Sequence, residues 1–206
     1  MTAILKVDTI QDTSGNNIIN ENANTVTIGK SGDTVNVVGT LQNGGTNFLQ
    51  GITMADSWRI TATYTSASGN STADLTSNWE RTDTFGFGQI GTGMTESSGI
   101  FSFPSTGIYY IKFNTSAFAS GGSRQFIGVQ IKTTTDNSNY NLAALSYQHA
   151  NSTNEYGSPT CDFIFDVTDI STHKVKFAVQ DPDPIGYEGD TSIDKTCVKF
   201  IRLGDT

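Results

Sequence analysis

The stretch GIFSFPSTGIYYIKF, residues 99–113, constrains the fold of this chain more than any other feature of the sequence. Its large apolar residues occupy every second position on both sides of a Pro-Ser-Thr turn: Phe101, Phe103, Tyr109, Ile111 and Phe113. Because successive side chains of a strand point to opposite faces, this alternation predicts two neighbouring strands that share one aromatic, buried face. Pro104 presets the backbone for a turn and Gly107 tolerates a positive φ, so we expect the two strands to form a hairpin.

Further strand-like segments recur about every ten to fifteen residues from Trp58 to the end of the chain. Clusters of Gly, Asn, Ser and Asp separate them, and helical periodicity is almost absent. This rhythm is typical of an antiparallel sandwich or barrel, and about 150 residues suit one jelly roll. We therefore predict an all-β fold in which an antiparallel jelly-roll sandwich forms a tip domain at residues 57–206.

The first part of the chain carries a near-repeat, TVTIG followed nine residues later by TVNVVG. Its apolar residues are too few to form a core within one chain. Repeats of this kind usually bury their apolar face against further copies of the repeat. Three chains wound together would provide that cover. Gly44 and Gly45 then mark a hinge. We predict a short trimeric β shaft and anchor at residues 1–45 and a linker at residues 46–56.

Charge and hydropathy argue against two classes of partner. The chain has 20 acidic residues against 12 Lys and Arg, a formal net charge of −8. Its cations are scattered singly, so we expect no nucleic-acid partner. No stretch approaches the ~20 consecutive apolar residues of a spanning helix, so we expect no membrane insertion. An acidic surface rich in Ser, Thr and Asn suits contact with neutral, hydroxyl-rich ligands.

Two cysteines, Cys161 and Cys197, are too few for a disulfide framework. Cys161 alternates in phase with Phe163, Phe165 and Val167, which favours a small, buried hydrophobic side chain. A disulfide between adjacent strands is the alternative.

The segment FSFPSTGIYYIKF resembles the core signature of the complement-q and tumour-necrosis-factor-like jelly rolls. The matching residues are Phe101, Gly107, Tyr109, Ile111 and Phe113. Gln89 and Met94 depart from the pattern, because the family has an Asn or Asp and an aromatic residue there. The closing GYEGDTSIDKTCVKFIRL looks like the family's final loop and strand, without its usual Phe-x-Gly ending. The resemblance implies a jelly-roll fold and a homotrimer.

The segments ILKVDTIQDTSGN and VTIGKSGDTVNVVGTLQ look like N-terminal parts of structural fibre and decoration proteins of tailed bacteriophages, especially marine ones. In those proteins the N-terminal segment docks on the particle, a short trimeric β shaft follows, and a globular tip faces outward. The resemblance implies a virion location, contact with other virion proteins through the N-terminal segment, and again a homotrimer. A secreted eukaryotic ligand is disfavoured, because the sequence shows neither a signal peptide nor collagen-like repeats.

An acidic loop, DPDPIGYEGD, is a candidate metal site. Its carboxylates are those of Asp181, Asp183, Glu188 and Asp190. Calcium prefers several oxygen ligands, so we consider Ca²⁺ as the one cofactor, although the spacing is not that of an EF-hand. The alternative is a solvated acidic loop that keeps sheet edges apart.

Two loops rich in Asn and Ser carry tyrosines that suit sugar recognition, in which aromatic faces act together with amide hydrogen bonds. The candidate ligand-binding residues are Tyr140, Asn141, Asn154 and Tyr156. We expect both loops to lie exposed, away from the N-terminal anchor, and to contact a glycan of the host surface. The alternative is the half-buried position that Tyr commonly takes in sandwiches.

Catalytic motifs are absent from the sequence, which has only two histidines and no Gly-x-Ser-x-Gly, His-Glu-x-x-His or Cys-x-x-Cys. Glu80 and Asp83 are a conceivable carboxylate pair for glycan cleavage, but a role as exposed surface charges is favoured. We expect a protein that is not an enzyme. Three functions stay open: host-surface recognition through the tip, capsid decoration without a receptor, and a glycan-degrading tailspike.

Overall fold

The computed structural model describes residues 38–39, 42–43, 46–47, 51–67, 69, 71–119, 126–150, 155–182 and 184–206. Its strands are β1 (Gln42–Asn43), β2 (Thr46–Asn47), β3 (Ala55–Ile60), β4 (Tyr64–Thr65), β5 (Ser71–Asp74), β6 (Trp79–Arg81), β7 (Thr95–Ser97), β8 (Ile100–Ser102), β9 (Gly107–Asn114), β10 (Ala117–Ala119), β11 (Phe126–Thr134), β12 (Asn141–His149), β13 (Tyr156–Gly157), β14 (Thr160–Val167), β15 (Lys174–Asp181), β16 (Ile185–Tyr187) and β17 (Cys197–Gly204). None of the described residues lies in a helix, and this part of the chain accordingly has no helix that could cross a membrane.

The chain divides into two compact units, Met1–Leu49 and Gln50–Thr206. In the first unit, β1 and β2 form a short antiparallel ladder in which Gln42 pairs with Asn47. Most of the predicted shaft and anchor lies outside the described residues, so its trimeric β structure stays a prediction.

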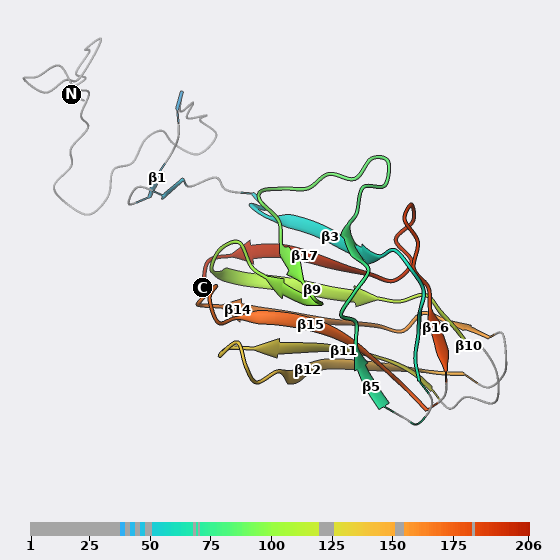
Figure 1. Ribbon diagram of the computed structural model, residues 1–206. Helices are drawn as coiled ribbons and strands as arrows, with labels where there is room; N and C mark the ends of the chain where they lie inside the picture. Colours follow the sequence, from blue (N-terminus) through green and yellow to red (C-terminus); the bar gives the residue numbers. More distant parts are fainter. Residues whose placement is uncertain are drawn as a thin grey trace, which may run out of the picture. The chain divides into compact units, whose positions relative to one another are not determined.

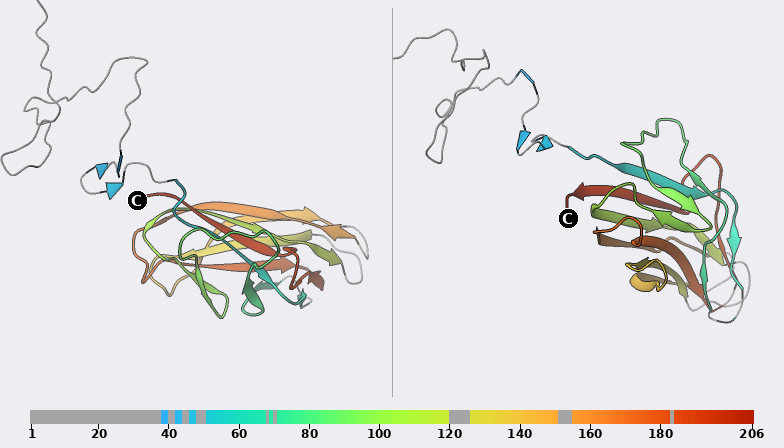
Figure 2. Two further views of the ribbon diagram at one scale, coloured as in Figure 1. Left: turned by 90° about the horizontal axis from the view of Figure 1, so that it is seen from above. Right: turned by 60° about the vertical axis from the view of Figure 1, so that its left-hand side comes forward.

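The second unit is a sandwich of two large antiparallel sheets (Figure 1, Figure 2). One sheet has five strands in the order β14-β9-β17-β3-β6. The other has six strands, with β12-β11-β15-β8-β7 as its path and β5 paired with the part of β15 that β8 leaves free. A four-stranded sheet, β13-β10-β16-β4, lies at one end of the sandwich (Figure 1). The predicted all-β antiparallel architecture is confirmed.

The core between the two large sheets is strongly aromatic, as the alternation in residues 99–113 predicts. Phe101, Phe103, Tyr109, Ile111 and Phe113 are all buried. Phe101 stands at the centre, because its ring contacts four others, those of Trp58, Trp79, Phe177 and Phe200. Edge-to-face rings place the positive edge of one ring against the negative face of another, which stabilises such clusters beyond the area they bury.

The predicted hairpin is wrong, because β8 and β9 belong to different sheets. β8 pairs with β7 and β15, whereas β9 pairs with β14 and β17. The turn between them is therefore an arch, a connection that crosses from one sheet to the other. Both strands face the same core from opposite sides, so their side chains show the phase that a hairpin with one buried face would show.

One hydrogen bond and one glycine fix the path of this arch. The Tyr109 hydroxyl donates a hydrogen bond of 2.9 Å to the carbonyl oxygen of Ser105. Gly107 has a φ of 144°, and a Cβ atom there would lie 2.5 Å from Arg202 Nε and 2.6 Å from the Gly204 carbonyl oxygen. The chain therefore needs glycine at the point where it enters the second sheet.

Cys161 and Cys197 are both buried free thiols, so the alternative of a disulfide is wrong. Cys161 pairs with Phe113 in the ladder between β14 and β9 and belongs to the hydrophobic core. Burial raises the pKa of the Cys161 thiol to about 12. The prediction of a small buried hydrophobic side chain is confirmed.

Candidate interaction surface

The carboxylates of the predicted metal loop are used mainly for bonds within the protein. Buried Asp181 accepts a hydrogen bond of 2.7 Å from Ser66 Oγ and one of 3.2 Å from the Tyr187 hydroxyl. Glu188 accepts bonds from Ser116 Oγ at 2.6 Å and Lys195 Nζ at 3.0 Å. The bond from Ser116, followed by the one from Lys195, holds the pKa of Glu188 below its ordinary value.

Asp190 closes its own turn, because it accepts the backbone N–H groups of Ser192 at 2.7 Å and Ile193 at 3.1 Å. The bond from Ser192, with a smaller contribution from Ile193, keeps the pKa of Asp190 low. Asp183 lies outside the described residues. In the part of the chain that the structure describes, no three His, Cys, Asp or Glu side chains are grouped to hold a metal ion. Calcium binding by this loop stays a prediction.

The two predicted ligand loops lie at opposite ends of β12. Tyr140 and Asn141 mark the start of this strand, and Tyr156 follows its other end. Nine residues at ~3.3 Å each separate the two ends by about 30 Å. Tyr140 and Tyr156 of one chain therefore do not form a common site. Asn154 lies outside the described residues.

The two tyrosines also differ in exposure. The ring of Tyr156 is 65% exposed, and Asn141 is exposed as well. Tyr140 is only half-buried, because Lys176 Nζ lies 4.1 Å from the centre of its ring and its hydroxyl is buried without a hydrogen-bond partner. The expectation of an exposed side chain thus fits Tyr156 and does not fit Tyr140, whose half-buried position is the one that the alternative describes.

The outer face of the five-stranded sheet carries an apolar row that crosses the strands. Residues that pair across antiparallel strands point to the same face of a sheet. Tyr110 on β9 pairs with Ile164 on β14 and with Ile201 on β17, and Ile201 pairs with Ala55 on β3. We use the name apolar row for Ile164, Tyr110, Ile201 and Ala55. Ile164 is 59% exposed, and the other three are half-buried.

Two residues further along β9 and β17, on the same face, the side chains are charged. Lys112 on β9 pairs with Lys199 on β17, directly beside Tyr110 and Ile201. On β14 the apolar row is flanked instead by two exposed acids, Asp162 and Asp166. The row is therefore bordered by Lys112 and Lys199 at its centre and by acids at its β14 end, where Asp162 pairs with Lys112.

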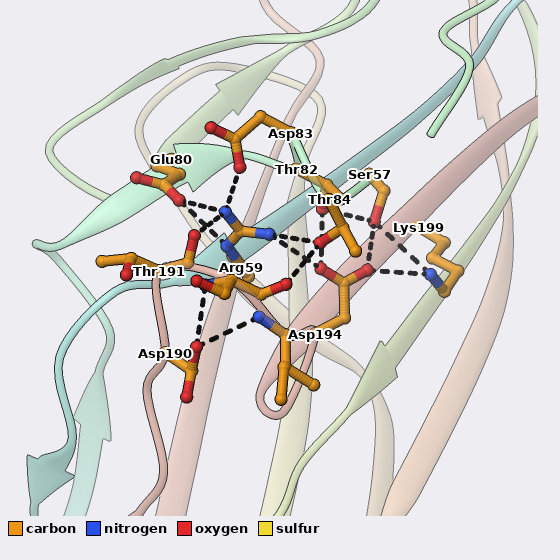
Figure 3. A network of polar contacts seen from close by, with 12 residues as sticks. Ser57, Arg59, Glu80, Thr82, Asp83, Thr84, Asp190, Thr191, Asp194 and Lys199 are labelled. Atoms are coloured by element: carbon orange, nitrogen blue, oxygen red, sulfur yellow. Dashed lines mark hydrogen bonds and ion pairs between the residues drawn. The ribbon is translucent and has the colours of Figure 1, made fainter. Parts of the chain in front are cut away.

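A polar network covers the part of this face next to β6 (Figure 3). Arg59 on β3 points away from the core, yet its side chain is fully buried. Its Nε donates to Glu80 Oε1 at 2.9 Å, its Nη1 donates to Thr84 Oγ1 at 2.7 Å, and its Nη2 donates to Asp83. Burial alone lowers the pKa of Arg59, but the bonds to Glu80 and Asp83 outweigh it, so the pKa is raised.

The same guanidinium fixes the loop that precedes β17. Its Nη2 donates to the carbonyl oxygen of Thr191, and its Nη1 lies 3.6 Å from Asp194 Oδ1. Asp194 is held further by Ser57 Oγ, Thr82 Oγ1 and Lys199 Nζ, at 3.2, 2.9 and 3.3 Å. Glu80 and Asp83 therefore act as structural anions around one buried cation. No local pattern in the sequence predicts this network, because its members come from separate segments and Arg59 and Thr191 are 132 residues apart.

No protein-family model and no curated protein matches the chain. Solved structures do resemble it in fold. Eiger TNF from S. frugiperda has a TM-score of 0.57 at 12% identity, over 75% of this chain and 95% of that chain. Murine APRIL at pH 5.0 has a TM-score of 0.53 at 12% identity, over 73% of this chain and 98% of that chain. The second unit thus has the jelly-roll fold of tumour-necrosis-factor-like proteins, as the motif around Tyr109 implies.

Proposed function

We propose that the chain is a structural, non-enzymatic virion protein of a tailed phage, which assembles as a homotrimer and displays its jelly roll on the particle. The observation that supports the homotrimer is the apolar row. Its side chains cross four strands of one sheet face and leave Ile164 largely exposed. Apolar groups arranged in this way are typical of a surface that another subunit covers.

The phage assignment draws its support from the N-terminal sequence. The segments that resemble fibre and decoration proteins precede the jelly roll, in the order anchor, shaft and tip. In this arrangement the N-terminal segment binds other virion proteins, and the jelly roll faces outward.

Host recognition by the displayed jelly roll is the favoured role, because Tyr156 presents an exposed aromatic ring in an Asn-rich loop. Three copies on one particle gain avidity, so each contact with a surface glycan can be weak. Capsid decoration is the rival role. The engagement of Glu80 and Asp83 by Arg59 favours binding over glycan hydrolysis.

Sedimentation equilibrium of the full chain tests the homotrimer directly. We expect a mass three times the 22.1 kDa of one chain. Ile164→Lys places a charge in the apolar row and should shift the protein to monomer. Ile170→Lys is the matched control, because Ile170 is also exposed and lies in the turn after β14, outside the row. A monomeric parent protein, or a trimer unaffected by Ile164→Lys, would contradict the proposal.

Adsorption of particles to host cells separates the two roles. Tyr156→Ala should leave assembly intact and reduce adsorption if the loop binds the host. Unchanged adsorption would favour capsid decoration.

A further inference from the structure

Phe85, between β6 and β7, is more exposed than any other large apolar side chain that the structure describes. The segment between β6 and β7 is drawn in green above β3 in Figure 1. Single apolar residues at a surface are ordinary, but a phenylalanine ring that is wholly in water gains none of the stabilisation that its burial would give.

A defined turn holds Phe85 outward. The Phe87 N–H donates a hydrogen bond of 2.9 Å to the Thr84 carbonyl oxygen, and Gly86 has a φ of 86°. A positive φ at the third residue is the mark of a type II turn, whose second residue projects at the corner. Phe85 occupies that corner.

The base of this turn is fixed by the network of Figure 3. Thr84 Oγ1 accepts a hydrogen bond from Arg59 Nη1 at 2.7 Å and donates one of 2.8 Å to the Ser192 carbonyl oxygen. The turn is thereby tied both to β3 and to the loop before β17. An exposed ring on a support that is already ordered loses little conformational entropy when it binds.

We propose that Phe85 of each subunit packs against the centre of the apolar row, at Tyr110 and Ile201, of the next subunit. This inference rests on the proposed homotrimer and names the contact that forms it. Of the two carboxylates beside the turn, Asp83 is the one largely in solvent, and its charge is opposite to that of Lys112 and Lys199 beside the row. Asp83 is 77% exposed and available for such a contact.

The arrangement also fits a closed ring. The projecting ring and the row are different patches of the same chain, so each subunit offers one patch to each neighbour. Contacts of this heterologous kind generate rings when the rotation closes. Opposite charges across the contact favour pairing of the Phe85 turn of one subunit with the apolar row of the next.

Covalent trapping tests the contact in the full-length protein. The double variant Phe85→Cys with Tyr110→Cys should form disulfides between subunits on oxidation and give a covalent trimer on a non-reducing gel. The control Phe85→Cys with Ile170→Cys, which moves the second thiol off the row, should give none. The native Cys161 and Cys197 are buried and do not interfere.

A second measurement does not depend on introduced thiols. Phe85→Ser should raise the dissociation constant of the trimer about tenfold or more, as the loss of a central aromatic contact does. Absence of trapping, together with an unchanged dissociation constant in a protein that sediments as a trimer, overturns this contact and leaves the homotrimer standing. A parent protein that sediments as a monomer overturns both.

Discussion

Replacing Phe101 with alanine would remove the ring at the centre of the sandwich. This side chain has no exposed surface, and its ring centre lies 5.6 Å from Trp58, 5.1 Å from Trp79, 5.4 Å from Phe177 and 5.4 Å from Phe200. A buried Phe→Ala change costs about 3–5 kcal/mol, and favourable ring pairs contribute about 0.5–1.5 kcal/mol each. Because Phe101 makes three edge-to-face contacts and the two sheets hold their positions, we expect a loss of about 5 kcal/mol.

Urea denaturation, followed by tryptophan fluorescence, measures this loss. With a slope of about 2 kcal/mol per molar urea, the midpoint should fall by about 2 M or more. Tyr156→Ala is the matched control, because it also removes an aromatic ring, but from an exposed position, and should change stability by less than about 1 kcal/mol. Equal midpoints for the two variants would show that Phe101 is not in a packed core and would refute the sandwich as described.

Two further predictions concern buried polar groups and thiols. Arg59→Ala should lower the free energy of unfolding by about 3–5 kcal/mol, because it leaves the carboxylates of Glu80 and Asp194 without their shared cation. Asp83→Asn should cost less than about 1 kcal/mol, because the Asp83 side chain is 77% exposed. Thermal unfolding of both variants checks this, and equal losses would contradict the description of Arg59 as the buried hub. Since burial raises the pKa of Cys161 from 9.0 to about 12, the folded protein should react with a thiol reagent at pH 8 only after urea is added. The same shift stabilises the folded protein fully below pH 9, and this stabilisation is lost as the pH rises toward 12. Labelling of the folded protein at pH 8 without urea would contradict the first expectation. An unchanged free energy of unfolding between pH 9 and 12 would contradict the second.

The alternation in residues 99–113 was sufficient to predict which side chains are buried, and the spacing of strand-like segments was sufficient to predict an antiparallel sandwich. The pairing of β8 and β9 was not predictable in this way. A local pattern records which face of a strand is covered, and it contains no information on the strand that supplies the neighbouring hydrogen bonds. The sequence therefore predicted the burial of Phe101 and Tyr109 correctly and their strand partners wrongly.

The candidate surfaces were less predictable for a related reason. Tyr140 has the polar neighbours of an exposed ligand residue, but Lys176 from β15 lies over its ring. Glu80 and Asp83 have the composition of a carboxylate pair, but Arg59 from β3 binds both. In each case the deciding contact comes from a different strand, and no spacing rule reveals it.

The arch between β8 and β9 has a consequence for how the chain folds. Most ladders of the five-stranded sheet join distant segments, and Ser57 of β3 and Lys199 of β17 are 142 residues apart. The arch instead brings the rings of Phe103 and Tyr109 to 4.7 Å across the sandwich within a few residues. Closing so short a loop costs little chain entropy, so the two halves of the core can meet here before either sheet is complete. We therefore expect the contacts at the arch to form early in folding and the pairing of β3 with β17 to form late.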